Sequence, residues 1–181
     1  MVYVFLAEGF EEIEALTPVD LLRRADVEVK TVGVTGSVVT GSHGIRVEAD
    51  ITLEEALSGV NEGFEMMILP GGMPGAKNLD ASEGVSAFID AAVKNDSYIA
   101  AICAAPMILG KRGVLEGKDA TCYPGFEDYL KGAKHYPASV VVDGNIVTSD
   151  GMGSALDFAL QLVSLLKGEA ESEKLADAIM A

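Results

Sequence analysis

The sequence predicts a single-domain α/β protein, residues 1–181, with a doubly wound, mostly parallel sheet and helices on both faces. Apolar runs typical of buried strands alternate with runs of helical periodicity, which is the pattern of parallel strands joined by crossover helices. The 181 residues include 20 glycines, with 49% hydrophobic and only 6% aromatic residues, which suits many tight turns between strands and helices. A chain of this length buries a sizeable core, and it contains no linker, repeat or low-complexity tract.

The first half of the chain alternates strand-like and helix-like runs. In chain order the expected elements are a strand at Val2–Leu6, a helix at Glu11–Ala25, a strand at Val27–Val34, a hairpin within Val38–Ile45, a helix at Thr52–Leu57, a strand at Met66–Leu69 and a helix at Ala81–Val93. Thr52 or Asp50 is available to cap the short helix. The order predicts strands that lie parallel and are covered by helices.

The second half continues this alternation. The expected elements are a strand and helix within Tyr98–Gly110, a strand at Ala120–Cys122, a short helix near Phe126–Leu130, strands at Val140–Val142 and Ile146–Thr148, and helices at Gly153–Lys167 and Glu171–Met180. Asp143-Gly144-Asn145 is a strong hairpin turn, so the two strands that flank it are expected to be antiparallel.

The charge of the chain excludes several function classes. A net charge of −15 argues against direct binding of nucleic acid or of an anionic membrane, because both need a basic surface. The apolar N-terminus lacks a basic segment, so it reads as a strand rather than a signal peptide. The longest apolar stretch is interrupted by Pro106 and is too short to span a bilayer. Two cysteines in a chain without export features predict a cytoplasmic protein with free thiols.

Cys103 lies in the most informative stretch, where a short apolar strand leads directly into a helix with Pro106 in its first turn. Backbone N–H groups and the helix dipole favour an anion there, so we expect the pKa of the thiol to fall. The sharp turn lifts the side chain out of the sheet, as in a nucleophile elbow, although the flanking glycines of that motif are absent. By residue type alone a buried cysteine is more often a small hydrophobe. The position favours a reactive thiol.

Backbone N–H groups around this cysteine are candidates for an oxyanion hole. In doubly wound sheets ligands bind outside the carboxyl ends of the strands, where Ala7–Gly9, Pro70–Gly72 and Cys103 are all expected. Consecutive glycines let the backbone approach a reacting atom, so Gly72 and Ala104 are expected to direct their N–H groups at an oxyanion. The glycine-rich turn lacks the GxGxxG pattern and the Walker lysine of nucleotide loops. The alternative is a tight turn whose glycines only satisfy a positive φ.

Glu14 is the second candidate catalytic residue. It lies four residues after Phe10 and seven before Leu21, so it shares a helical stripe with apolar side chains. Turned inward, its carboxyl group would have a raised pKa and could donate a hydrogen bond to a thiolate. Glu11 and Glu12 belong to the first turn and are expected to serve the helix dipole. The alternative for Glu14 is a solvated acid at an exposed rim.

The remaining candidates carry weaker signals. His43 lies in a Gly-Ser-His-Gly turn, and no His/Cys/Asp spacing resembles a zinc site, so no metal is expected. Cys122 ends a predicted strand and is either a resolving thiol or, as we favour, a buried structural residue. Arg24 ends the first helix, where a cation suits the dipole; anion binding is its alternative role.

Four motifs occur in order between Met1 and about Lys167: Ala7-Glu-Gly-Phe-Glu-Glu-Ile-Glu14, Leu69-Pro-Gly-Gly72, Ala101-Ile-Cys103-Ala and Thr148-Ser-Asp-Gly-Met-Gly-Ser154. Together they resemble the ThiJ/PfpI family, and within it the branch of the Parkinsonism-associated DJ-one protein and its bacterial relatives. The resemblance implies a flavodoxin-like fold, a homodimer and an oxidation-prone cysteine at a nucleophile elbow. On that pattern Cys103 is the nucleophile and Glu14 the acid hydrogen-bonded to it. Gly72 and Ala104 supply N–H groups, and Arg24 lies near the anion pocket.

Two residues depart from the family pattern. The protease-like branch has a histidine directly after the cysteine, where this chain has Ala104, which argues against peptidase activity. The animal branch has a histidine where this chain has Tyr123, so an obvious proton shuttle is lost. Tyrosine donates a hydrogen bond but is a poor base at neutral pH. His43 aligns roughly with an arginine that approaches the partner subunit's site, which makes it an accessory candidate across a dimer interface.

The resemblance implies two functions. The first is a cofactor-free enzyme of glyoxalase or deglycase type, in which Cys103 attacks a small reactive carbonyl substrate, a 2-oxoaldehyde or its adduct. The second is a redox-stress sensor or chaperone whose Cys103 oxidises to a sulfinic acid stabilised by Glu14, without significant turnover. A non-catalytic binding module, with an unreactive Cys103, is the third reading.

Overall fold

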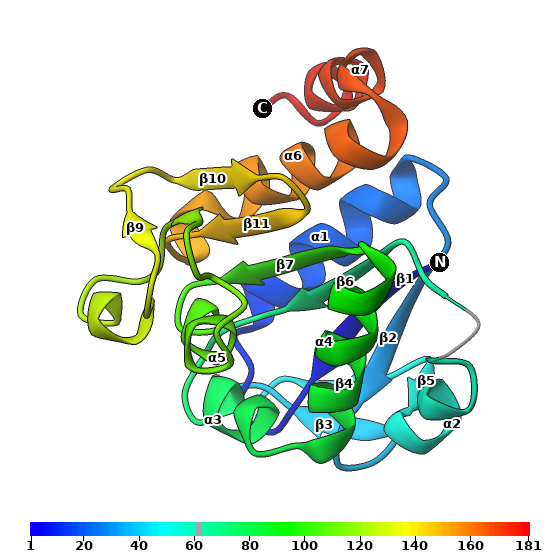
Figure 1. The fold of residues 1–181 in the computed structure, drawn as a ribbon. Helices are drawn as coiled ribbons and strands as arrows, with labels where there is room; N and C mark the ends of the chain where they lie inside the picture. The colour runs from blue at the N-terminus through cyan, green and yellow to red at the C-terminus, as the bar shows by residue number, and fades with distance from the viewer. Residues whose placement is uncertain (61–62) are drawn as a thin grey trace.

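A seven-stranded sheet forms the centre of the computed structural model, which describes residues 1–60 and 63–181 (Figure 1). From one edge to the other the strands are β10 (Val140–Asp143), β11 (Ile146–Ser149), β7 (Tyr98–Ile102), β6 (Met66–Leu69), β1 (Val2–Leu6), β2 (Val29–Gly33) and β5 (Ile51–Thr52). Among these described strands only β10 and β11 pair antiparallel. The predicted α/β fold with a mostly parallel sheet is therefore confirmed.

Helices cover both faces of the sheet. One face carries α1 (Glu12–Arg24) and α6 (Ala155–Lys167), with α7 (Glu169–Ile179) packed on α6. The other face carries the remaining α-helices, which are α2 (Leu53–Ser58), α3 (Gly75–Asp80), α4 (Glu83–Asn95) and α5 (Pro106–Lys111). The described residues also include the 3-10 turns η2 (Glu127–Tyr129) and η3 (Met152–Ser154).

Most predicted elements are present, with shifts of one or two residues at their ends. The hairpin expected within 38–45 forms from β3 (Val38–Thr40) and β4 (Arg46–Glu48), so its second strand lies just beyond the expected range. Thr52 caps α2 in a capping box with Glu55. Two expectations need correction: the segment near 126–130 is a 3-10 turn, and the strand at 120–122 shrinks to β8 (Asp119–Ala120), which pairs with β9 (Lys134–His135) outside the main sheet. Helix α3 and the short strands β5 and β9 were not expected from the sequence.

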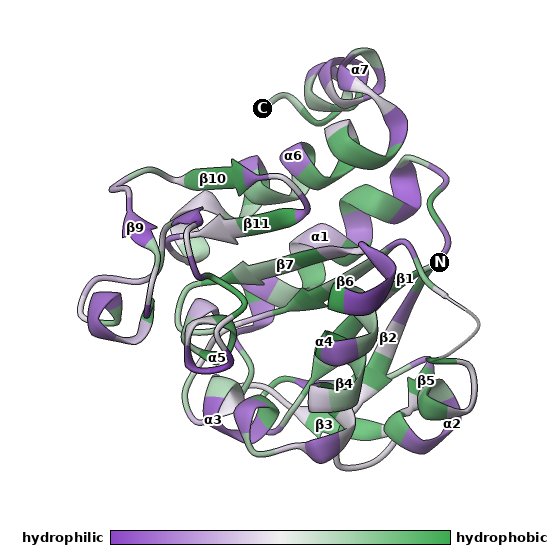
Figure 2. Cartoon of the chain, in the orientation of Figure 1, coloured by the Kyte–Doolittle hydropathy of each residue, from purple (hydrophilic) through white to green (hydrophobic). Residues whose placement is uncertain are grey.

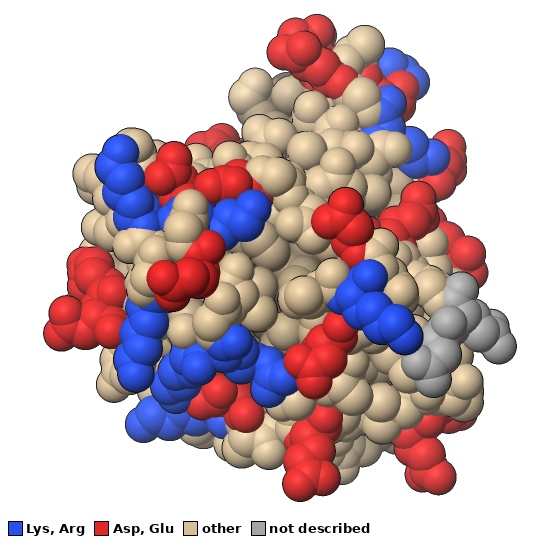
Figure 3. Space-filling model, viewed as in Figure 1, with Lys and Arg blue, Asp and Glu red and all other residues tan. Residues whose placement is uncertain are grey.

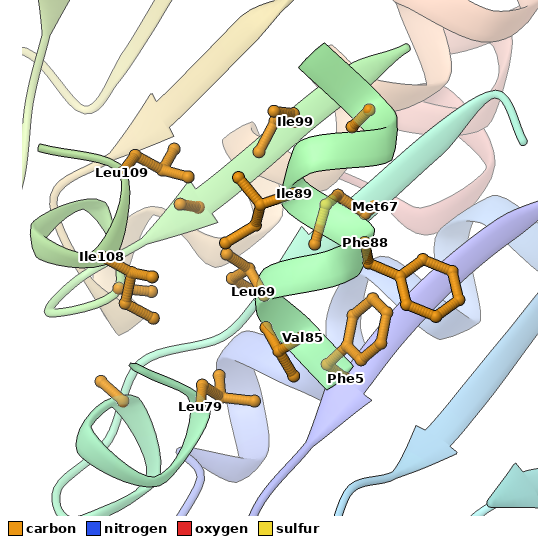
Figure 4. Close-up of a cluster of buried hydrophobic side chains, with 14 of the residues drawn as sticks. Phe5, Met67, Leu69, Leu79, Val85, Phe88, Ile89, Ile99, Ile108 and Leu109 are labelled. Atoms are coloured by element: carbon orange, nitrogen blue, oxygen red, sulfur yellow. The ribbon is translucent and has the colours of Figure 1, made fainter. Parts of the chain in front are cut away.

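The sheet is buried on both faces because each strand contributes side chains alternately to two cores. In β1, Phe5 packs under the helices of one face, whereas Val4 and Leu6 pack against α1 and α6. Figure 2 shows the central strands as mainly hydrophobic, and Figure 4 shows Phe88 of α4 packed against Phe5, with the two rings tilted edge to face. Their ring centroids are 4.9 Å apart, at an interplanar angle of 64°. Helices packed on both faces therefore bury the central strands.

The strand order places a switch point between β1 and β6. From β1 the chain builds β2 and β5 on one side, and then crosses to build β6 and β7 on the other. Ligands of doubly wound sheets bind outside the carboxyl ends of strands at such a point. The segments that leave these ends are Ala7–Gly9 after β1, Pro70–Gly72 after β6 and Cys103 after β7. The predicted convergence of these segments follows from the topology.

Acidic and basic side chains are interspersed on the face shown in Figure 3. The basic ones gather mainly around α5, and several are paired with acids, as Lys111 is with Asp80 and Arg112 with Asp90. Within the part of the chain that is described, this face offers no broad basic surface of the kind that nucleic acid binding needs. No helix of the described residues is long and apolar enough to cross a membrane.

Candidate active site

Cys103 occupies a sharp turn between β7 and α5. Its φ is +64°, in the left-handed region that residues with a side chain rarely adopt. Backbone hydrogen bonds hold this conformation from two sides. The Cys103 N–H donates to the Ser149 carbonyl at 2.9 Å, and the Cys103 carbonyl accepts from the Tyr123 N–H at 2.8 Å. The backbone therefore has the geometry expected of an elbow, without the glycines that usually flank one.

Two backbone N–H groups point at the sulfur. They belong to Gly72 and Ala104, and both act to lower the pKa of Cys103. Gly72 has a φ of +84°, and a Cβ at this position would lie 2.4 Å from the Glu11 nitrogen. Glycine is thus required where the loop after β6 crosses the start of α1. The structure brings together the two N–H donors that the sequence singled out.

The side chain of Glu14, in α1, lies beside the Cys103 sulfur. This side chain is buried, with only 1% of the residue exposed, and its carboxylate oxygen Oε2 accepts a hydrogen bond from the Gly71 N–H at 2.9 Å. It is also hydrogen-bonded to Cys103. The prediction that the apolar stripe of this helix turns Glu14 inward is confirmed, and the solvated-rim alternative is wrong.

Gly71 is the residue that sequence reasoning missed. A Cβ at this position would lie 2.7 Å from Glu14 Oε2, 2.8 Å from Cys103 Cβ and 3.0 Å from the Ala104 nitrogen. Gly71 therefore fits between the carboxyl group and the cysteine only because it has no side chain. The signal was present in the sequence as a pair of consecutive glycines, of which only the second had been assigned a role.

Burial makes both ionisable groups of the site hold their protons. It raises the pKa of Glu14 to about 7, although the hydrogen bonds with Cys103 and Gly71 act in the opposite direction. Burial and the nearby Glu14 carboxylate raise the pKa of Cys103 to about 12. The expectation that the pKa of the Cys103 thiol falls is therefore wrong. The two N–H groups act as expected but are outweighed by desolvation and repulsion.

The two groups titrate as a pair. Between the two pKa values the pair keeps one proton, which either group can hold. A proton on Glu14 removes the repulsion and provides a hydrogen bond to sulfur, so it is the arrangement that permits a thiolate. Glu14 thereby controls the nucleophilicity of Cys103 by the position of one proton.

Glu12 anchors the β3–β4 hairpin to the start of α1. It is buried, and Oε1 accepts the His43 N–H at 2.8 Å while Oε2 contacts His43 Nδ1 at 3.0 Å. Although burial opposes it, the hydrogen bonds from His43 and the backbone lower the pKa of Glu12 to about 2. Glu12 lies in the first turn of α1, as expected, and its carboxylate has a further role that was not expected, which is to hold the hairpin.

His43 projects from this hairpin and is exposed. Its pKa is raised by the hydrogen bond with Glu12 and by the charge of Glu11. Ligand atoms of these three residues lie within 4.8 Å of one another. Both oxygens of Glu12 already accept hydrogen bonds from the hairpin. Attachment of the hairpin to α1 therefore explains why Glu11, Glu12 and His43 lie together.

The structure does not bring Arg24 to the cysteine. Arg24 lies in the last turn of α1, ten residues beyond Glu14 and thus about 15 Å further along the helix axis. Its Nε pairs with Asp20 at 2.8 Å on the exposed surface. The expectation that Arg24 lies near an anion pocket is therefore not supported by its position, and its role at the helix end is the simpler one.

Tyr123 and Cys122 lie beside the elbow and differ in exposure. Tyr123 is 49% exposed and adjoins Cys103 through its backbone N–H. Cys122 is only 2% exposed, and burial raises the pKa of its thiol to about 12. Both cysteines are free, which fits the expected buried structural role of Cys122.

The sequence that builds this site matches a known protein family over nearly the whole chain. The model of the DJ-1/PfpI family matches residues 1–165. The chain belongs to the DJ-1/PfpI family. The resemblance drawn from the four sequence motifs is thereby confirmed.

Three relatives are similar to this chain over most of their own length. Protein dj-1beta of Drosophila melanogaster is 35% identical over 180 residues, which are 98% of this chain and 95% of that protein. The glutathione-independent glyoxalase DJR-1.2 of Caenorhabditis elegans is 31% identical over 170 residues, 93% of this chain and 89% of that protein. The structure of oxidized Toxoplasma gondii DJ-1 superposes with a TM-score of 0.93 at 36% identity, covering 99% of this chain and 97% of that one.

Proposed function

We propose that this DJ-1/PfpI protein is a cysteine-dependent, cofactor-free enzyme of glyoxalase or deglycase type that acts on 2-oxoaldehydes or their adducts. The observation that carries the proposal is the buried Glu14 carboxyl group, hydrogen-bonded to the Cys103 thiol beside two N–H donors. A nucleophile, a proton-carrying group and oxyanion donors are the parts that this chemistry requires. The similarity to a relative named as a glyoxalase supports the reaction class.

The reaction begins with the Cys103 thiolate attacking the aldehyde carbon of a 2-oxoaldehyde such as methylglyoxal. A carbon–sulfur bond forms, and the oxygen takes up the proton as a hemithioacetal. Glu14 then removes the proton from this carbon and returns it to the neighbouring ketone carbon, while the proton of the hemithioacetal hydroxyl moves to the ketone oxygen. These two shifts convert the adduct into a thioester of lactate. Water cleaves the thioester, so the sum is methylglyoxal plus water giving lactate, with no net oxidation.

The backbone at the elbow stabilises the charge that develops. The N–H groups of Gly72 and Ala104 stand beside the sulfur, where the oxygen of the hemithioacetal forms. Glu14 has a pKa raised to about 7 by burial, which is suited to taking and giving a proton near neutral pH. Tyr123 borders the site as a hydrogen-bond donor in place of the histidine of the animal branch.

Lactate production from methylglyoxal tests the proposal. The wild-type protein is compared with Cys103→Ala, and Cys122→Ala serves as the matched control because it removes the other thiol. We expect lactate formation to fall to the uncatalysed background in Cys103→Ala and to persist in Cys122→Ala. Equal rates in the wild type and Cys103→Ala would remove the enzyme proposal.

A redox-stress role is the second candidate, and one observation favours it. A similar structure, that of Toxoplasma gondii DJ-1, is described as oxidized. In this chain a protonated Glu14 and the N–H groups of Gly72 and Ala104 would all donate to the oxygens of a sulfinic acid on Cys103. Background lactate production combined with ready sulfinate formation would favour this candidate over the enzyme.

We also propose a homodimer that pairs the α1 faces of two copies. Ile13 and Ile45 are 51% and 54% exposed, and they flank a shallow groove that Leu16 and Leu21 also line. An apolar strip of this kind on a polar surface is typical of an interface. His43 and Ile45 lie in the same turn, between β3 and β4, so the partner subunit would pass close to His43.

A further inference from the structure

Glu11 is a third acidic residue beside the candidate site, and the reaction proposed above does not use it. It is the N-cap residue of α1, one helical turn before Glu14. The Glu11 N–H donates to the Gly71 carbonyl at 3.0 Å, while the Gly71 N–H donates to Glu14 Oε2 at 2.9 Å. The backbone of Glu11 and the carboxyl group of Glu14 are therefore bound to the two polar groups of one residue in the loop after β6.

The side chain of Glu11 is held in place and is only 14% exposed. Ser42 Oγ donates to Glu11 Oε2 at 3.0 Å, and His43 Nδ1 lies 3.6 Å from Oε1. A charge in a partly buried position is screened less by salt than a charge on a freely exposed side chain. The Glu11 carboxylate therefore acts on neighbouring groups more strongly than an exposed acid would.

The ionisable groups that act on Glu14, among the described residues, come from two elements. They are Glu11, from its own helix, and Cys103, from the turn after β7. The loop after β6 contributes a backbone N–H. Glu8 and Glu12 turn instead to the hairpin, where each accepts a backbone N–H, at 3.2 Å and 2.8 Å respectively. Apart from the cysteine, Glu11 thus supplies the charge that faces Glu14.

The charge of Glu11 acts on one side of the pair that shares a proton. It raises the pKa of Glu14, whereas the carboxylate that raises the pKa of Cys103 is that of Glu14. A negative charge beside Glu14 disfavours the state in which Glu14 is ionised and Cys103 holds the proton. It therefore favours the other state, with the proton on Glu14 and a thiolate at Cys103.

We propose that Glu11 is a positioning residue for the shared proton: its carboxylate keeps the proton on Glu14 and thereby favours the Cys103 thiolate. A protonated His43 moderates this effect, because its ring contacts Glu11 and Glu12 and partly neutralises their charge. The inference deepens the proposed function, in which Glu14 moves a proton of the substrate. It is measured on the thiol itself and needs no turnover.

Alkylation of Cys103 by iodoacetamide tests the proposal through its pH dependence. The thiolate displaces iodide and forms a carbon–sulfur bond, so the rate reports the fraction of thiolate. The rate is followed in Cys122→Ala, alone and combined with Glu11→Gln, which keeps an oxygen to accept from Ser42 but carries no charge. The lower of the two titration steps of the pair, near the Glu14 pKa of about 7, is the informative one.

The expected signature is a difference on one side of that step only. Below the step Glu14 is protonated with or without the charge of Glu11, so the two rates should coincide. Above it we expect Glu11→Gln to react about threefold more slowly and the step to lie about 0.5 pH unit lower, since a full unit corresponds to a factor of ten. Removal of a negative charge near a thiol ordinarily has the opposite effect, because the thiolate becomes easier to form.

Three further variants separate the charge of Glu11 from its structural contacts. Glu11→Asp keeps the carboxylate and should retain the original titration. Glu173→Gln removes an exposed charge on α7 and should leave the titration unchanged, because salt screens distant charges. His43→Gln removes the moderating cation, so the rate just above the lower step should rise. The proposal is overturned if Glu11→Gln is as fast as the parent protein above the step, if it is slower at every pH, or if Glu11→Asp behaves like Glu11→Gln.

Lactate production from methylglyoxal separates this inference from the proposed function. A shifted titration in Glu11→Gln, with no lactate formed by the wild type above background, would refute the enzyme proposal and leave the role of Glu11 standing. Lactate formation by the wild type, with an unchanged titration in Glu11→Gln, would refute the role of Glu11 alone. If both proposals hold, kcat/KM of Glu11→Gln should fall by the same factor of about three above the lower step.

Discussion

The Glu14 carboxyl group and the Cys103 thiol are hydrogen-bonded to each other, with Gly71 filling the narrow space beside them. The glutamate comes from the first helix and the cysteine from the turn after β7, so only the folded chain brings them together. Each makes the other harder to ionise, because two negative charges at this buried point repel each other. The chemistry of the site therefore depends on a single proton held between carboxyl and sulfur.

The stability of the protein should depend on pH through Glu14. Its pKa is raised from 4.5 to about 7, so the folded state binds a proton more tightly than the unfolded state. This contribution is fully present below pH 4.5 and is lost as the pH rises through 7. The free energy of unfolding of the wild type should fall by up to about 3 kcal/mol relative to Glu14→Gln across this window.

Chemical denaturation at a series of pH values measures this difference. The exposed substitution Glu173→Gln serves as the control and should follow the wild type at every pH. A wild-type curve parallel to that of Glu14→Gln would show that Glu14 is not protonated in the folded protein near neutral pH.

Gly71→Ala should damage both stability and reactivity. The added Cβ would meet Glu14 Oε2 at 2.7 Å and Cys103 Cβ at 2.8 Å, so the two side chains must separate. We expect a loss of about 1–3 kcal/mol in the free energy of unfolding. Gly59→Ala is the matched control, because its Cβ would find its nearest neighbour at 3.9 Å. If Gly71→Ala and Gly59→Ala unfold at the same denaturant concentration, Gly71 is not needed to let Glu14 and Cys103 approach each other.

Limited peroxide should oxidise Cys103 before Cys122. Cys103 is partly exposed and faces two N–H groups that stabilise sulfinate oxygens, whereas Cys122 is 2% exposed. Mass spectrometry of peptides after brief treatment should find the added oxygens on Cys103. Oxidation of Cys122 first would contradict the assignment of Cys103 as the reactive thiol.

Ile13→Lys and Ile45→Lys should shift the protein towards the monomer. Light scattering at micromolar concentration should give the wild type a mass of twice the 18.9 kDa of one chain, and a lower mass for either variant. Val93→Lys provides the control, because Val93 is 54% exposed on α4 and lies outside the proposed interface. A wild type that scatters as a single chain would reject the dimer and the cross-subunit role of His43.

The sequence was sufficient to predict the parallel sheet, because its buried strands are short apolar runs between turn residues. It also predicted the inward turn of Glu14, since that residue shares a helical stripe with Phe10 and Leu21. The role of Glu12 could not be predicted, because it depends on a hairpin contributed by residues distant in sequence. The raised pKa of Cys103 could not be predicted for a similar reason. The helix start that lowers this pKa is visible in the local sequence, whereas the burial and the Glu14 carboxylate that raise it come from the tertiary fold.

The titration of Cys103 alkylation tests the central claim most directly. Iodoacetamide rates are followed against pH in Cys122→Ala, alone and combined with Glu14→Gln or Glu14→Leu. We expect two steps when Glu14 is present, near the pKa values of about 7 and about 12 that the pair shows. Glu14→Gln, which keeps a donor but no charge, should give one step below 12, and Glu14→Leu should react more slowly than Glu14→Gln at neutral pH. Identical titrations in all three proteins would show that Glu14 and Cys103 do not share a proton.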